Sequence, residues 1–260
     1  LSSYGIELNI VHNILTNDES QNNLLNNIIN IVRVKGYYGV NIDFSYILPG
    51  DKQLFVNFIS KATSILNQEG IDVFVSLNIS SLEIQSGILN RGYDFKAIGE
   101  IANSVLLVSH DFYASTYCIP RYFISFSKIQ SVIEEIIIQI PRDKIIIEMS
   151  IIGYVIKFPY TEGESVANVI NNKNAIELAS QVNAFVTYDT INQVSSYTYV
   201  DNDEEFHVVF NDERAAENFI RIIQVYGLQG IAIWNIMYYP AQLWLLINGL
   251  FDIVKLDNND

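Results

Sequence analysis

The sequence predicts an α/β fold of repeated βα units, of the size of a single (β/α)8 barrel. Three observations support this prediction. The chain has 260 residues, about the length of one such barrel. Half of the residues are hydrophobic and only 17% are charged, as in folded globular proteins. Short β-branched segments alternate with longer segments of helical period, which is the pattern of a parallel sheet covered by helices.

Six short segments are predicted to be the strands of this sheet. Each is almost entirely apolar, as expected for a strand that is buried on both faces. The predicted strands are 6–11, 40–44, 73–77, 105–109, 145–149 and 230–235.

Five helical segments lie between these strands. In 19–35, apolar residues recur at spacings of three and four, and Gly36 follows as a typical helix end. The other predicted helices are 51–68, 95–102, 127–138 and 212–226.

One interval, 158–212, departs from the βα alternation. A helix-like segment at 175–182 precedes strand-like segments at 185–188, 195–200 and 207–210. The last two flank Asp201, Asn202 and Asp203, which predict a hairpin turn. We therefore expect 158–212 to form a small α+β insertion, with the barrel built from 1–157 and 213–260.

Charge and composition exclude several classes of partner. The 29 acidic and 15 basic residues give a net charge of −14, which repels nucleic-acid phosphates. The single cysteine, Cys118, excludes an internal disulfide, and His12, His110 and His207 lack the spacing of a metal site. No segment has the length and apolarity of a membrane span. The sequence thus predicts no metal, cofactor, nucleic acid or membrane span.

Polar residues alternate through the second predicted strand. Asn41, Asp43 and Ser45 are two residues apart, so we expect them to share one face. Residues at the carboxyl end of a barrel strand line the active-site mouth. From this pattern alone, Asp43 is either a functional carboxylate or a hydrogen-bonded turn residue.

This stretch resembles the fourth-strand signature of glycoside hydrolase family 18, Asp-x-x-Asp-x-Asp-x-Glu. Tyr38 and Asn41 stand at the first two acidic positions, as in the spore cortex-lytic subgroup, and Asp43 keeps the third. Ser45 occupies the position of the catalytic glutamate. The resemblance extends over most of the chain, with matching segments at 15–17, 36–47, 205–212, 226–230 and 234–235.

The resemblance implies a (β/α)8 TIM-type barrel with the α+β insertion as one wall of a substrate groove. In that family two strands precede the one that 6–11 matches, so we expect the first two strands to be lacking here. Either residues upstream of Leu1 supply them, or a six-stranded sheet is left with two exposed edges.

The implied chemistry requires two protein groups. In the family, the 2-acetamido oxygen of the substrate attacks the anomeric carbon, while one carboxylic acid protonates the leaving oxygen and an aspartate orients the acetamide. The resemblance gives Asp43 the second role. Ser45 cannot take the first, because a hydroxyl is too weak an acid. Asp111, after the fourth predicted strand, is the best replacement.

The resemblance also implies a set of sugar contacts. His110 stands where the family has a tyrosine, and is either a contact or a packed histidine. Trp234 matches the tryptophan that floors the site, with core packing as the alternative. The substrate-binding residues implied are Asn41, Tyr46, His110, Tyr154, Trp234 and Asn235.

Several departures from the family pattern argue against full activity. Ile152, Val155 and Ile156 stand where the family has aromatic or polar residues. We expect a catalytically impaired domain that binds N-acetylated glycan such as peptidoglycan or its fragments. The alternatives are an active N-acetylglucosaminidase and a purely structural protein. Spore or cell-wall association follows only by family analogy.

Overall fold

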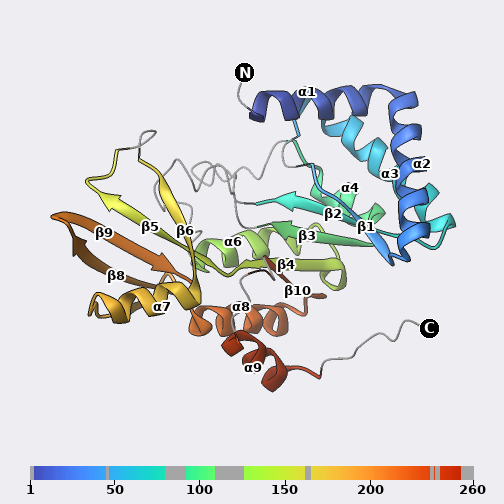
Figure 1. The fold of residues 1–260 in the computed structure, drawn as a ribbon. Coiled ribbons are helices and arrows are strands. Elements are labelled where there is room, and N and C mark those ends of the chain that lie inside the picture. Colours follow the sequence, from blue (N-terminus) through green and yellow to red (C-terminus); the bar gives the residue numbers. More distant parts are fainter. Residues whose placement is uncertain are drawn as a thin grey trace. The chain divides into compact units, whose positions relative to one another are not determined.

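The chain forms two compact units. The first consists of Leu1–Asp111, Lys128–Glu148 and Ile223–Ala232, and the second of Phe112–Ser127, Met149–Ile222 and Ile233–Asp260. The structure, a computed structural model, describes residues 3–44, 47–79, 92–108, 126–161, 165–234, 237 and 241–252. Figure 1 shows the helices and strands along the chain.

A five-stranded sheet lies mainly in the first unit. Its order is β1-β2-β3-β4-β10, and β1 to β4 pair in parallel. These strands agree within two residues with five of the six that the sequence predicts, because each is a short apolar segment. Their bounds are β1 Gly39–Ile42, β2 Asp72–Asn78, β3 Ser104–Val108, β4 Ile145–Ser150 and β10 Gly230–Trp234.

The prediction of a strand at 6–11 is wrong. This segment lies inside helix α1, Ser3–Thr16. Val11 and Leu15 are four residues apart and buried, whereas Ile10 is exposed, so the burial pattern has the helical period. Packing of that stripe overrides the strand preference of the β-branched residues. The expectation that two strands are lacking assumed that 6–11 is the third strand of the barrel. Instead β1, which carries the fourth-strand signature, is the first strand of the described sheet.

The predicted helices are all present. Helix α2 ends at Gly36, whose φ of 65° is left-handed and whose N–H bonds to the carbonyl of Val32, as the sequence predicts. Asn17 caps its first turn. The helices are α2 Asp18–Lys35, α3 Lys52–Gln68, α4 Phe95–Ile101, α6 Phe126–Ile136 and α8 Glu213–Tyr226, followed by α9 Ala241–Leu250.

One face of the parallel sheet is apolar and covered by helices. Helices α2, α3 and α4 contact β1, β2 and β3 in turn (Figure 1). Burial of each such side chain stabilises the fold by about 1.5–3 kcal/mol. The fully buried residues of this face are Val73, Val75, Leu77, Val105, Leu107, Ile145 and Ile147.

The second unit contains an antiparallel sheet of order β6-β5-β9-β8-β7. The β8–β9 hairpin turns at Asn202 and Asp203, whose φ values of 50° and 60° are those of a type I′ turn. The sheet begins at Ile152, earlier than the insertion boundary expected at 158. Its elements are β5 Ile152–Phe158, β6 Ala167–Asn171, α7 Asn172–Gln181, β7 Thr187–Asp189, β8 Val194–Asp201 and β9 Glu204–Phe210.

One apolar cluster of this second unit lies between α7 and the sheet. Ala175 and Ala179 on α7 pack with Tyr197, Val208 and Phe210. The Tyr197 hydroxyl donates to the carbonyl of Ala175 at 2.7 Å, so a buried polar group finds a partner inside this core. In the part of the chain that the structure describes, no helix is long and apolar enough to cross a membrane.

Candidate functional site

Polar side chains gather on the other face of the parallel sheet. The Asn41 amide donates to the Ser76 hydroxyl at 2.8 Å, and Ser76 is 1% exposed. The side chains of Asn41 and Asp43 are exposed, whereas Ile42 between them is buried. This alternation places Asn41, Ser76 and Asp43 on one face of β1 and β2, as the sequence predicts for Asn41 and Asp43.

The strand register extends this face to β4. Ser76 pairs with Leu106 and Leu106 pairs with Ile146, and residues in register on parallel strands point to the same face. Glu148 lies two residues after Ile146, so it shares the Asn41 face, and it is 6% exposed. Sequence reasoning missed this second carboxylate. A glutamate within an apolar strand was the available signal, because burial of a carboxylate is costly.

Tyr93 connects the carboxyl ends of β1 and β2. Its hydroxyl donates to the carbonyl of Phe44 at 3.3 Å. Burial raises the pKa of Tyr93 well above its ordinary value, a hydrogen bond with the backbone of Asn78 lowers it, and the charge of Asp43 raises it further. The hydroxyl therefore lies within the electrostatic reach of Asp43. No local sequence pattern indicates this residue, because its contacts depend on tertiary structure.

Five of the expected site residues lie outside the described part of the chain. The structure therefore places four expected residues: Asn41 and Asp43 in the first unit, and Tyr154 and Trp234 in the second. The five that are not described are Ser45, Tyr46, His110, Asp111 and Asn235.

The structure brings Tyr154 and Trp234 together. Tyr154 on β5 is buried in an apolar cluster with Ile152 and Ile156, and Trp234 is partly buried against that cluster. The Ile151 N–H donates to the Trp234 carbonyl at 3.0 Å, which joins the start of β5 to the end of β10. Ile152 and Ile156, two of the departures from the family pattern, thus pack in this core.

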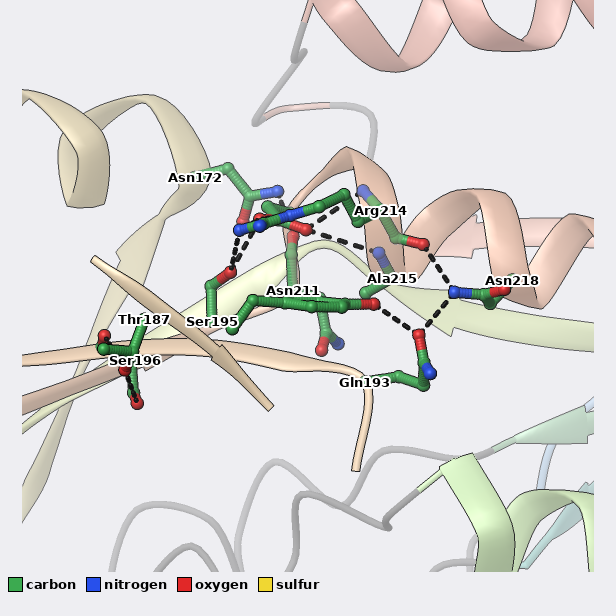
Figure 2. A network of polar contacts seen from close by, with 11 residues as sticks. Asn172, Thr187, Gln193, Ser195, Ser196, Asn211, Arg214, Ala215 and Asn218 are labelled. Atoms are coloured by element: carbon green, nitrogen blue, oxygen red, sulfur yellow. Dashed lines mark hydrogen bonds and ion pairs between the residues drawn. The ribbon is translucent and has the colours of Figure 1, made fainter. Parts of the chain in front are cut away.

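A hydrogen-bond network surrounds Asp212 at the start of α8. The carboxylate accepts the Ser195 hydroxyl at 2.6 Å and the Arg214 Nε–H at 2.9 Å. The backbone N–H groups of Arg214 and Ala215 also donate to it, at 3.0 and 3.3 Å. Figure 2 shows Ser195, Arg214 and Ala215 in this network. Burial acts to raise the pKa of Asp212, but these donors outweigh it and lower the pKa.

A small pocket lies beside this network in the second unit. Ile151, Asn172, Asn211, Asp212 and Leu243 contribute to its lining. The Asn172 amide N–H donates to the Asn211 carbonyl, and its Oδ1 has no hydrogen-bond partner among the described residues. The lining of this pocket is mainly apolar.

No metal centre is evident in the described ranges. Among these residues, no three His, Cys, Asp or Glu side chains are grouped so that they could hold a metal ion. The polar face of the sheet instead offers carboxylates, an amide and a hydroxyl, which are groups that form hydrogen bonds with a polar organic ligand.

Comparisons with known proteins identify a family. Residues 11–238 match the family model Glycosyl hydrolases family 18. The cortical fragment-lytic enzyme of Bacillus subtilis (strain 168) is 30% identical over 244 residues, which cover 93% of this chain and 56% of that relative. The cortical fragment-lytic enzyme of Bacillus anthracis is 26% identical, with coverages of 93% and 56%. This chain therefore spans little more than half the length of these relatives.

A solved structure shows the same fold. The spore cortex-lytic enzyme SleL of Bacillus megaterium QM B1551 superimposes with a TM-score of 0.84 at 30% identity. The match covers 94% of this chain and 56% of that chain.

Proposed function

Because the chain belongs to glycoside hydrolase family 18, we propose that it is a catalytically impaired member that binds a glycan containing N-acetylglucosamine, such as peptidoglycan. The observation that carries the proposal is the combination of Asp43, exposed at the end of β1, with a serine at position 45. The relatives named for cortex lysis support a glycan of the spore cortex or cell wall.

The chemistry of the two positions explains the expected impairment. A carboxylate at Asp43 can accept a hydrogen bond from the acetamido N–H and stabilise positive charge that develops on the sugar. Ser45 cannot donate a proton to a leaving oxygen near neutral pH. Because general acid catalysis contributes about 10²- to 10⁴-fold, its loss leaves binding largely intact and turnover slow.

Isothermal titration calorimetry with N-acetylglucosamine oligomers and with muropeptides tests binding. We expect measurable heat for the wild-type chain, and a dissociation constant that rises by about tenfold or more in Asp43→Asn, since a charge-assisted hydrogen bond contributes about 1.5–3 kcal/mol. Asp143→Asn, an exposed aspartate of the same unit, is the matched control and should bind as wild type. Absence of heat with both ligands would remove the binding proposal.

Hydrolysis of the same oligomers by wild type and by Ser45→Glu tests the impairment. We expect Ser45→Glu to release reducing ends and wild type to release them at a rate lower by about 10²-fold or more. Comparable turnover by both proteins would show that another acid acts. Failure of both to bind or cut would favour the purely structural alternative.

A second candidate function, active N-acetylglucosaminidase, is favoured by one observation. Glu148 is a carboxylic acid on the same face of the sheet as Asn41, and Asp111 is the replacement that the sequence suggests. In this case wild type cuts, and Glu148→Gln or Asp111→Asn abolishes cutting. Glu135→Gln, on the exposed surface of α6, is the control. Turnover equal to that of wild type in both Glu148→Gln and Asp111→Asn would exclude both acids.

A further inference from the structure

Two adjacent residues, Gly92 and Tyr93, contact the chain on both sides of positions 45 and 46. The Tyr93 hydroxyl donates to the carbonyl of Phe44 at 3.3 Å. A Cβ atom added to Gly92 would lie 2.0 Å from the carbonyl oxygen of Ile47 and 2.8 Å from its carbon. Such distances are far inside van der Waals contact, so only glycine fits at this position.

The contact between Tyr93 and Phe44 is anchored among aromatic side chains, two of which belong to helix α3. Tyr93 is 2% exposed, and its ring centroid lies 6.0 Å from that of Phe55 and 6.0 Å from that of Phe95. The ring of Phe44 stacks on Phe58 at 5.7 Å. Close-packed aromatic groups of this kind hold one arrangement, so the tyrosine hydroxyl is a fixed donor.

The hydroxyl of Tyr93 also joins two strands that carry polar residues of the Asn41 face. It hydrogen bonds with Phe44, which follows β1, and with the backbone of Asn78 at the end of β2. The charge of Asp43 also raises its pKa. The Tyr93 hydroxyl, which belongs to neither strand, therefore links the carboxyl end of β1 to that of β2.

We propose that Gly92 and Tyr93 are positioning residues that fix the carboxyl end of β1, and with it Asp43. This inference rests on the proposed function, because positioning matters only if Asp43 meets a ligand. Misplacement of a functional group by about 1 Å can reduce its contribution by about 10²-fold. Neither residue needs to touch the glycan to have this effect.

The first experiment needs no ligand. Hydrogen–deuterium exchange of the full chain is followed in peptides that cover residues 43–48, in Tyr93→Phe and in Gly92→Ala. We expect faster exchange in these peptides and unchanged exchange in α6. The controls are Tyr37→Phe, which alters an exposed tyrosine, and Gly50→Ala, where an added Cβ meets nothing within 4 Å. Unchanged exchange at 43–48 in both test variants would overturn the inference.

The second experiment separates positioning from general destabilisation. The affinity for an N-acetylglucosamine tetramer is measured for wild type, Tyr93→Phe, Asp43→Asn and the double variant, with NMR titration where binding is weak. We expect Tyr93→Phe to weaken binding by about fivefold or more, and to have almost no effect in the Asp43→Asn background. Equal losses in both backgrounds would show that Tyr93 does not act through Asp43.

The two experiments distinguish two failures. If the exchange at 43–48 rises as expected but the wild-type chain binds no oligomer, the proposed function falls while the anchoring of this segment stands. If wild type binds and Tyr93→Phe binds equally well, the positioning role falls while the proposed function stands.

Discussion

The ionisation of Asp212 is coupled to stability. Its pKa is lowered in the folded chain, because donors from Ser195, Arg214 and Ala215 outweigh the effect of burial. A carboxyl whose folded pKa lies below its unfolded value of about 3.9 stabilises the fold above that value. This stabilisation is lost as the pH falls through the folded pKa.

We therefore expect Asp212→Asn to reduce the free energy of unfolding at pH 7 by about 1.5–3 kcal/mol. Arg214 is more than half exposed, so solvent screening limits its share of this effect. The difference from wild type should shrink as the pH is lowered below about 4. Urea denaturation across this pH range measures it, with Asp201→Asn, an exposed aspartate of β8, as the control. A difference that does not change with pH would contradict the assignment.

Some residues of the candidate site could be predicted from the sequence and others could not. The alternation of Asn41, Ile42 and Asp43 was predictable, because the period of a strand is local. The relation of Glu148 and Tyr93 to Asp43 was not predictable, since it depends on strand register and on a contact between residues 44 and 93. The register of a parallel sheet is set by packing between segments that are distant in the sequence.

At the scale of elements, the β8–β9 turn makes a sharp prediction. Asn202 has a φ of 50°, a conformation that asparagine tolerates and β-branched residues strongly disfavour. We expect Asn202→Val to reduce the free energy of unfolding by about 1–2 kcal/mol. The same change at Asn168 on strand β6, where the backbone is extended, is the control and should be neutral. Equal effects at both positions in thermal unfolding would contradict the turn assignment.

Five of the six predicted strands are present, and the sixth is part of a helix. The five sheet strands were found because a strand buried on both faces is a short apolar run. Segment 6–11 has the same local composition but lies in α1, since Val11 and Leu15 form a stripe with helical spacing. Composition in a six-residue window cannot separate these cases, and the helical period appears only when residues up to 15 are included.

At the scale of the whole molecule, the family was identifiable because its signature is distributed. The functional residues of a barrel come from the ends of several strands, so matching segments occur throughout the chain, and the family model accordingly covers residues 11–238. On the proposed function, the same distribution lets a single changed position, Ser45, alter the chemistry while the fold is retained.

The net charge of −14 predicts how salt should affect recognition of two related ligands. An uncharged N-acetylglucosamine oligomer has no long-range interaction with an acidic protein, so its affinity should not change between about 50 and 500 mM NaCl. A muropeptide that carries peptide carboxylates is repelled by the same field. Salt screens that repulsion, so its affinity should rise by a few-fold over this range. Calorimetry at both salt concentrations measures the two trends, with the oligomer as internal control. Weaker binding of the muropeptide at high salt would instead require a local cationic contact that overrides the net charge.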